Sequence, residues 1–125
     1  RMAVNKPYEY DWFEAPEKFG VNAGKLCNVA GIARLLDITT DKLWSLLRRD
    51  AGAPTPYKSN YLTSPVYWRE EMEEWLYKLG MLVELDSVRG QYTALAIVET
   101  LDNSEKYVYP LQIMEMARKT KEMTE

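Results

Sequence analysis

The sequence predicts a small α+β protein, and three observations carry this prediction. Apolar residues recur at helical spacing in four segments, residues 28–36, 40–49, 69–79 and 111–123. Short segments rich in β-branched and aromatic residues lie between these helices, next to turn residues, and predict strands. The length of 125 residues fits one domain with a single core and additional terminal arms.

Residues 1–27 combine aromatic residues with turn residues. Two prolines and two glycines exclude a long helix in this segment. We therefore expect an extended arm that packs its aromatic side chains onto the domain, among them Tyr8, Tyr10, Trp12 and Phe13. An arm that binds a partner protein is the alternative, because exposed aromatic residues are frequent in interfaces.

Two short helices are predicted over residues 28–36 and 40–49, with Asn28 and Thr39 as suitable N-cap residues. The second helix would direct Leu43, Leu46 and Leu47 into the core. Two short helices joined by a tight turn form a helix-turn-helix.

The segment that follows is predicted to form a β-loop and a third helix. Gly52, Pro54, Pro56 and Pro65 exclude a helix over residues 50–67. Residues 57–58 and 66–68 can pair as two short strands around a loop at 59–65. Helix 69–79 would bury one apolar face, direct its glutamates outward and end at Gly80; the buried residues would be Met72, Trp75, Leu76 and Leu79, and the outward ones Glu70, Glu71, Glu73 and Glu74.

The C-terminal extension, residues 81–125, is predicted to contain strands and one helix. Residues 81–85 read as a strand. Residues 92–100 are expected to pair with 106–109 in a β-hairpin, although the Ala94-Leu95-Ala96 centre also suits a helix. An amphipathic helix over 111–123 completes the extension.

The composition argues against an enzyme. The chain has no histidine and one cysteine, Cys27, so no internal disulfide, no histidine-activated nucleophile and no usual zinc ligand set is available. Adjacent glutamates on helix 69–79 diverge and do not converge on one ion. We therefore expect no catalytic residue, no metal and no cofactor. Since no signal peptide and no membrane-length apolar run is apparent, we expect a cytoplasmic protein of a bacterial or phage-infected cell that does not contact membranes.

The net charge of −3 is unusual for a nucleic-acid binder, but the charges are unevenly distributed. Residues 81–125 hold five basic and eight acidic side chains and so carry the whole deficit. Residues 39–69 hold five basic side chains against two acidic ones, Asp41 and Asp50, which gives a local excess of +3.

The segment from 28 to 80 resembles a known family. It reads VAGIARLLDITTDKLWSLLRR, then APTPYK, then VYWREEMEEWL. This order is similar to the winged helix-turn-helix of phage excisionases, AlpA-type regulators and MerR-type repressors. Leu35 to Thr39 match the turn, which in the family is of the Gly-Val-Ser kind and has Asp37 here in the place of the glycine. Trp44 matches the aromatic residue within the second helix, and residues 53–58 match the Pro-x-Pro stretch. Trp68-Arg69-Glu70-Glu71 and Glu74-Trp75-Leu76 complete the match.

The resemblance implies a DNA-binding surface. The second helix would face the major groove and the loop 57–67 would form the wing, while basic groups would hold phosphates. The implied contact residues are Thr40, Asp41, Lys42, Trp44, Ser45, Arg48, Arg49, Lys58, Ser59, Asn60, Tyr61 and Arg69. For each, the alternative is an ordinary surface residue, and for Trp44 it is packing against the wing.

We therefore expect a sequence-specific regulator of double-stranded DNA, of phage or mobile-element type. Asp41 and the neutral wing tip depart from the family pattern and weaken phosphate binding. Useful affinity would then require a homodimer or cooperative assembly, for which the extension offers Leu111, Met114, Met116 and Met123, unless these complete the core. Two alternatives are a factor that uses the same fold to bind or inhibit a host protein, and a DNA-packaging or replication accessory protein.

Overall fold

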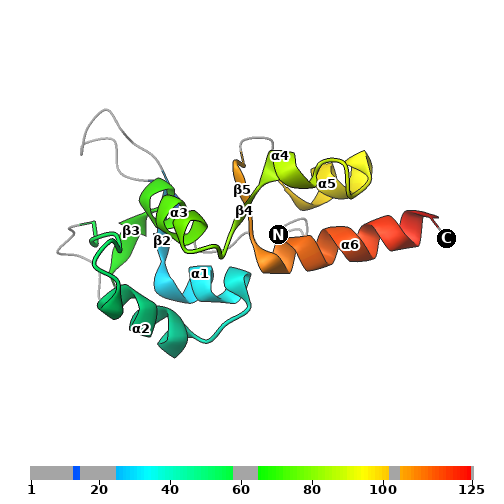
Figure 1. Ribbon diagram of the computed structural model, residues 1–125. Coiled ribbons are helices and arrows are strands. Elements are labelled where there is room, and N and C mark those ends of the chain that lie inside the picture. The colour runs from blue at the N-terminus through cyan, green and yellow to red at the C-terminus, as the bar shows by residue number, and fades with distance from the viewer. Residues whose placement is uncertain (1–12, 15–24, 58–64, 102–104, 125) are drawn as a thin grey trace, which may run out of the picture.

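The computed structural model describes residues 13–14, 25–57, 65–101 and 105–124, which form an α+β fold with two small antiparallel sheets (Figure 1). In chain order, the elements are β1 (Phe13–Glu14), β2 (Lys25–Asn28), α1 (Val29–Leu36), α2 (Thr40–Arg49), β3 (Val66–Trp68), α3 (Arg69–Lys78), β4 (Val83–Glu84), α4 (Leu85–Val88), α5 (Ala94–Thr100), β5 (Tyr107–Val108) and α6 (Pro110–Thr124).

The first sheet has the order β1-β2-β3 and separates two groups of buried side chains. Cys27 lies opposite Tyr67 in the register, and both side chains enter the core beneath the helices. Their neighbours along the strands alternate to the other face, where Leu26, Val66 and Trp68 pack together with Tyr57. The sequence did not predict β2, because its first three residues fall at the end of the segment read as an arm and Asn28 was assigned to the following helix as its N-cap.

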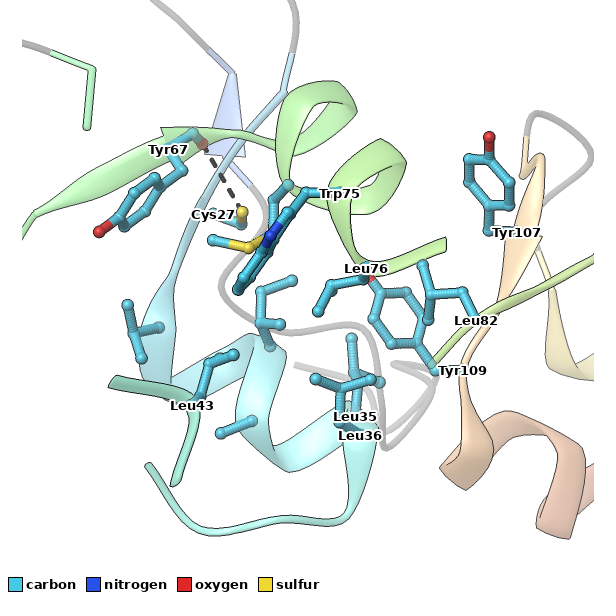
Figure 2. Close-up of a cluster of buried hydrophobic side chains, with 14 residues drawn as sticks. Cys27, Leu35, Leu36, Leu43, Tyr67, Trp75, Leu76, Leu82, Tyr107 and Tyr109 are labelled. Carbon is cyan, nitrogen blue, oxygen red and sulfur yellow. Dashed lines mark hydrogen bonds between the residues drawn. The ribbon is translucent and has the colours of Figure 1, made fainter. Parts of the chain in front are cut away.

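The first core lies among α1, α2, α3 and β2 (Figure 2). It also receives Leu82, Tyr107 and Tyr109 from the C-terminal extension. A second core contains Leu85, Val88, Ile97, Leu101, Val108 and Met116. In Figure 1, α1, α2 and α3 lie at one side of the β4–β5 pair, and α4 and α5 at the other.

Strand β5 joins the two cores. Successive side chains of a strand point to opposite sides, so Tyr107 and Tyr109 enter the first core while Val108 enters the second. Helix α6 also contacts both, since Leu111 packs against the first core and Met116 is buried in the second.

Four of the predicted helices are confirmed as α1, α2, α3 and α6. The Asn28 side chain accepts from the Gly31 amide at 2.7 Å, and the Thr39 hydroxyl accepts from the Lys42 amide at 3.1 Å, as expected for N-caps. Gly80 ends the third helix with a φ of 83°, in the left-handed region that glycine favours. The predicted arm lies outside the described residues, apart from β1 and β2.

The predicted C-terminal β-hairpin is wrong, because residues 94–100 form helix α5. The Thr93 hydroxyl caps this helix by accepting from the Ala96 amide at 3.2 Å. Ala96, Ile97 and Thr100 are buried at helical spacing. Strand β5 pairs instead with β4, through Val83 and Val108. The strand predicted over residues 81–85 is reduced to β4, since Leu85 begins helix α4.

Candidate nucleic-acid interface

Helix α2 has five exposed residues, Thr40, Asp41, Lys42, Arg48 and Arg49, and Ser45 is half-buried between them. Leu43 is its only buried residue, and Trp44, Leu46 and Leu47 are half-buried against the first core. Its interior side therefore attaches the helix to α1 and the core, while the opposite side is exposed to solvent.

The open side carries the predicted polar residues. Successive residues of a helix are about 100° apart, so Lys42, Ser45 and Arg49 follow one row along the helix, and Asp41, Ser45 and Arg48 follow a second. Thr40 also is exposed, in the first turn. Thr40, Asp41, Lys42, Ser45, Arg48 and Arg49 are thus brought together on one helix, and Trp44 flanks them while packing partly against the core.

The cations on this surface are not neutralised within the described part of the chain. Lys42, Arg48 and Arg49 are exposed, and none of them forms an ion pair with a described residue. The Arg49 side chain donates one weak hydrogen bond to the Ser45 carbonyl at 3.4 Å. Asp41 is the one acidic residue of α2, so three cations face a single carboxylate and the helix has a net charge of +2.

Asp50 anchors the segment that leaves α2, and the sequence reasoning did not identify it. The indole N–H of Trp75 donates to the Asp50 carboxylate at 2.5 Å, and the Gly52 amide donates at 3.3 Å. These two donors lower the pKa of Asp50, so the carboxylate is charged at neutral pH. Its place as one of two acidic residues in the locally basic segment 39–69 was the available signal.

Of the strand pair predicted between residues 57–58 and 66–68, the described residues show one isolated antiparallel bridge, between Tyr57 and Val66. The Tyr57 amide donates to the Val66 carbonyl at 2.7 Å, and the Tyr57 ring meets Trp68 edge-on with the ring centroids 4.9 Å apart. The four predicted contact residues of the wing, Lys58, Ser59, Asn60 and Tyr61, lie outside the described residues.

The prediction that Arg69 holds a phosphate is contradicted by its surroundings. Arg69 is 8% exposed, and its guanidinium donates to Glu73 at 2.9 Å and to Glu105 at 2.5 Å. Although burial alone would lower the pKa of Arg69, the two carboxylates outweigh burial and raise it. The side chain is therefore a permanent cation in the interior that links α3 to the segment before β5, and it is not part of the candidate surface.

The prediction that Glu73 points outward is also wrong. Its carboxylate accepts from the Tyr109 hydroxyl at 2.7 Å as well as from Arg69, and the residue is buried. Burial raises the pKa of Glu73, against the opposing effects of Arg69 and the tyrosine hydroxyl. Glu70, Glu71 and Glu74 are exposed as predicted, and Glu74 accepts from the Tyr107 hydroxyl at 2.9 Å.

The side chains suggested for assembly divide into two groups. Leu111 and Met116 pack into the two cores, whereas Met114 and Met123 are exposed. Leu95 and Val98 of α5 are also exposed, at 53% and 55%.

Within the described part of the chain, no cluster of histidine, cysteine, aspartate or glutamate side chains has the arrangement of a metal site. The same residues contain no helix with the length and apolar character needed to cross a membrane.

No protein-family model, no curated protein and no solved structure matches this chain.

Proposed function

We propose that the protein is a sequence-specific regulator that binds double-stranded DNA, of the winged helix-turn-helix type found in excisionases and related phage or mobile-element proteins. Helix α2 would read a short site in the major groove, and the loop between Tyr57 and Val66 would act as the wing. The observation that carries this proposal is the exposed face of α2, on which three cations have no carboxylate partner among the described residues.

The arrangement of side chains on α2 supports this role. Thr40, Asp41 and Lys42 occupy the first turn, from which a recognition helix reaches base edges, and Arg48 and Arg49 lie at the other end, where phosphates would be within reach. The turn before α2 supports the resemblance too. Asp37 has a φ of 61°, so it occupies the left-handed conformation for which the family pattern provides a glycine.

Binding to a random duplex at low salt tests the proposal. Three described cations, with Lys58 as a fourth candidate, predict that log K falls with log salt with a slope of about −3. A fluorescence anisotropy titration from 50 to 200 mM salt should then show an affinity loss of roughly 60-fold. Absence of binding at the lowest salt would contradict the proposal.

A second candidate function is binding to a host protein on the same scaffold. The exposed Leu95 and Val98 on α5, together with the net charge of −3, favour it. Pull-down from lysate with and without nuclease separates the two functions. A DNA-binding protein should lose its associated material after nuclease treatment, whereas a protein-binding factor should retain one partner.

A further inference from the structure

Asp50 connects three parts of the candidate interface. Its amide donates to the Leu46 carbonyl at 3.1 Å and so closes α2, and its own carbonyl accepts from the Ala53 amide at 3.1 Å. Its carboxylate receives the Trp75 indole on one oxygen and the Gly52 amide on the other. One residue therefore holds the end of α2, the turn that follows it and helix α3.

Trp75 is a rigid support for this contact. The side chain is 5% exposed and belongs to the first core, where Figure 2 shows it near Cys27 and Leu76. A buried indole N–H requires an acceptor, and Asp50 supplies it. The position of Asp50, and with it the direction of the chain toward Tyr57, is thereby fixed relative to the core.

The charge of Asp50 opposes the proposed function. The carboxylate follows Arg48 and Arg49 directly in the chain, and a negative charge near phosphates weakens binding to DNA. If charge were the only contribution, removal of Asp50 would strengthen binding. If its hydrogen bonds position the interface, removal would weaken binding even though a repulsive charge is lost.

We propose that Asp50 is a positioning residue for DNA binding, which holds α2 and the segment leading to the Tyr57–Val66 bridge in the orientation that fits a groove. This inference rests on the proposed function. It requires that the hydrogen bonds of Asp50 strengthen DNA binding by more than its negative charge weakens it.

Three variants separate the two contributions. Asp50→Ala removes both the charge and the hydrogen bonds, and it should weaken binding to the random duplex about fivefold at a temperature where the protein is fully folded. Asp50→Asn removes the charge and keeps one acceptor oxygen, which can retain the bond from the Trp75 indole while the bond from the Gly52 amide is lost. With the indole bond in place, it should bind as tightly as the unmodified protein or about twofold more tightly. Asp86→Ala, on the exposed surface of α4, is the matched control and should leave affinity unchanged.

Trp75→Phe tests the same contact from the other side, because it removes the donor but keeps an aromatic body. The Asp50→Ala and Trp75→Phe effects on DNA affinity should be non-additive, since each removes the same hydrogen bond. Additive effects, or an Asp50→Ala variant that binds at least as tightly as Asp50→Asn, would overturn the proposal.

Hydrogen exchange in the free protein measures, in the absence of DNA, how well Asp50 orders the neighbouring backbone amides. In Asp50→Ala the amides of Ala53 and Tyr57 should exchange faster than in Asp50→Asn, which keeps the indole bond, while the amides of α1 stay protected. Equal exchange in the two variants would show that Asp50 orders nothing locally and would refute the proposal. A protein whose exchange changes as expected but which binds no duplex would instead refute the DNA-binding function, and with it this role of Asp50.

Discussion

Arg69 and Arg118 each lie between two glutamates, but in different surroundings. The side chain of Arg69 is 9% exposed and contacts Glu73 and Glu105, whereas that of Arg118 is 54% exposed and contacts Glu115 and Glu122. A buried charge that loses its partner is costly, because water cannot replace the lost contact, while an exposed pair contributes little. The two arginines therefore form a matched pair for testing what burial contributes.

Arg69→Ala should lower the free energy of unfolding by about 3–5 kcal/mol, because it leaves two buried carboxylates without their cation. Arg118→Ala should leave the unfolding midpoint nearly unchanged. Urea denaturation of both variants measures the difference. Equal effects, or a stable Arg69→Ala variant that loses only DNA affinity, would restore the original prediction that Arg69 is a surface cation.

Glu73 should give the protein an unusual dependence of stability on pH. Its pKa is raised above the ordinary value of 4.5, because burial disfavours its charged form, so the folded state holds the proton more tightly than the unfolded state. Stability linked to this group is therefore present below pH 4.5 and is lost as the pH rises through the folded-state pKa.

Comparison with Glu73→Gln isolates this dependence. As the pH increases from about 4.5 to neutral, the urea midpoint of the unmodified protein should fall relative to that of the variant. Parallel pH profiles for the two proteins would contradict the assigned direction of the shift.

The sequence predicted which side chains are exposed better on α2 than on α3, and the reason is physical. Exposure on α2 follows from helical periodicity around Leu43, which is a local property. Arg69 and Glu73 are buried with partners from distant parts of the chain, since Glu105 pairs with Arg69 and Tyr109 donates to Glu73, and local spacing does not contain that information. The same applies to Asp50, whose indole partner is 25 residues away.

At the scale of elements, helix ends account for much of the agreement between prediction and structure. After α3, the Gly80 amide donates to the Tyr77 carbonyl and the Met81 amide to the Leu76 carbonyl, both at 2.9 Å. This pattern is a Schellman motif, which requires a left-handed residue, and a glycine at position 80 made it recognisable in the sequence.

Gly80→Ala should destabilise the protein by about 1 kcal/mol, because only the backbone conformation resists a Cβ and no atom lies within 4 Å of it. Gly90→Ala is the control. Its site is equally open but has no positive φ, so the substitution should be neutral or slightly stabilising. Thermal unfolding of both variants tests this, and equal effects would show that the left-handed conformation carries no cost.

Helix α5 shows where local patterns are insufficient. Residues 92–100 contain β-branched residues and resemble a strand, yet Thr93 caps a helix and Ile97 and Thr100 enter the interior at helical spacing. In the folded protein β5 pairs with β4, while α5 packs against α6 and buries Ile97 in the second core. Strand pairing over that distance in the chain is a tertiary property.

At the scale of the whole molecule, the two cores share β5 and α6, so we expect them to unfold together. Among the described residues, Trp44, Trp68 and Trp75 all lie outside the second core. In a Trp12→Phe background, tryptophan fluorescence therefore reports on the other part of the molecule. Met116 is fully buried in the second core.

Met116→Ala should lower the free energy of unfolding by about 2–5 kcal/mol, and the fluorescence and far-UV circular dichroism midpoints should shift together. A fluorescence transition that stays in place while the circular dichroism signal changes would show two independently folding parts.

The surface of α2 is the central claim, and the affinity of alanine variants for duplex DNA tests it most directly. Lys42→Ala and Arg48→Ala should each weaken binding by roughly 1–2 kcal/mol and reduce the salt slope by about 1, because each removes a cation with no carboxylate partner among the described residues. Arg89→Ala, on the exposed surface of α4, should have no effect. Unchanged affinity and slope for both α2 variants would contradict the proposed DNA-binding surface.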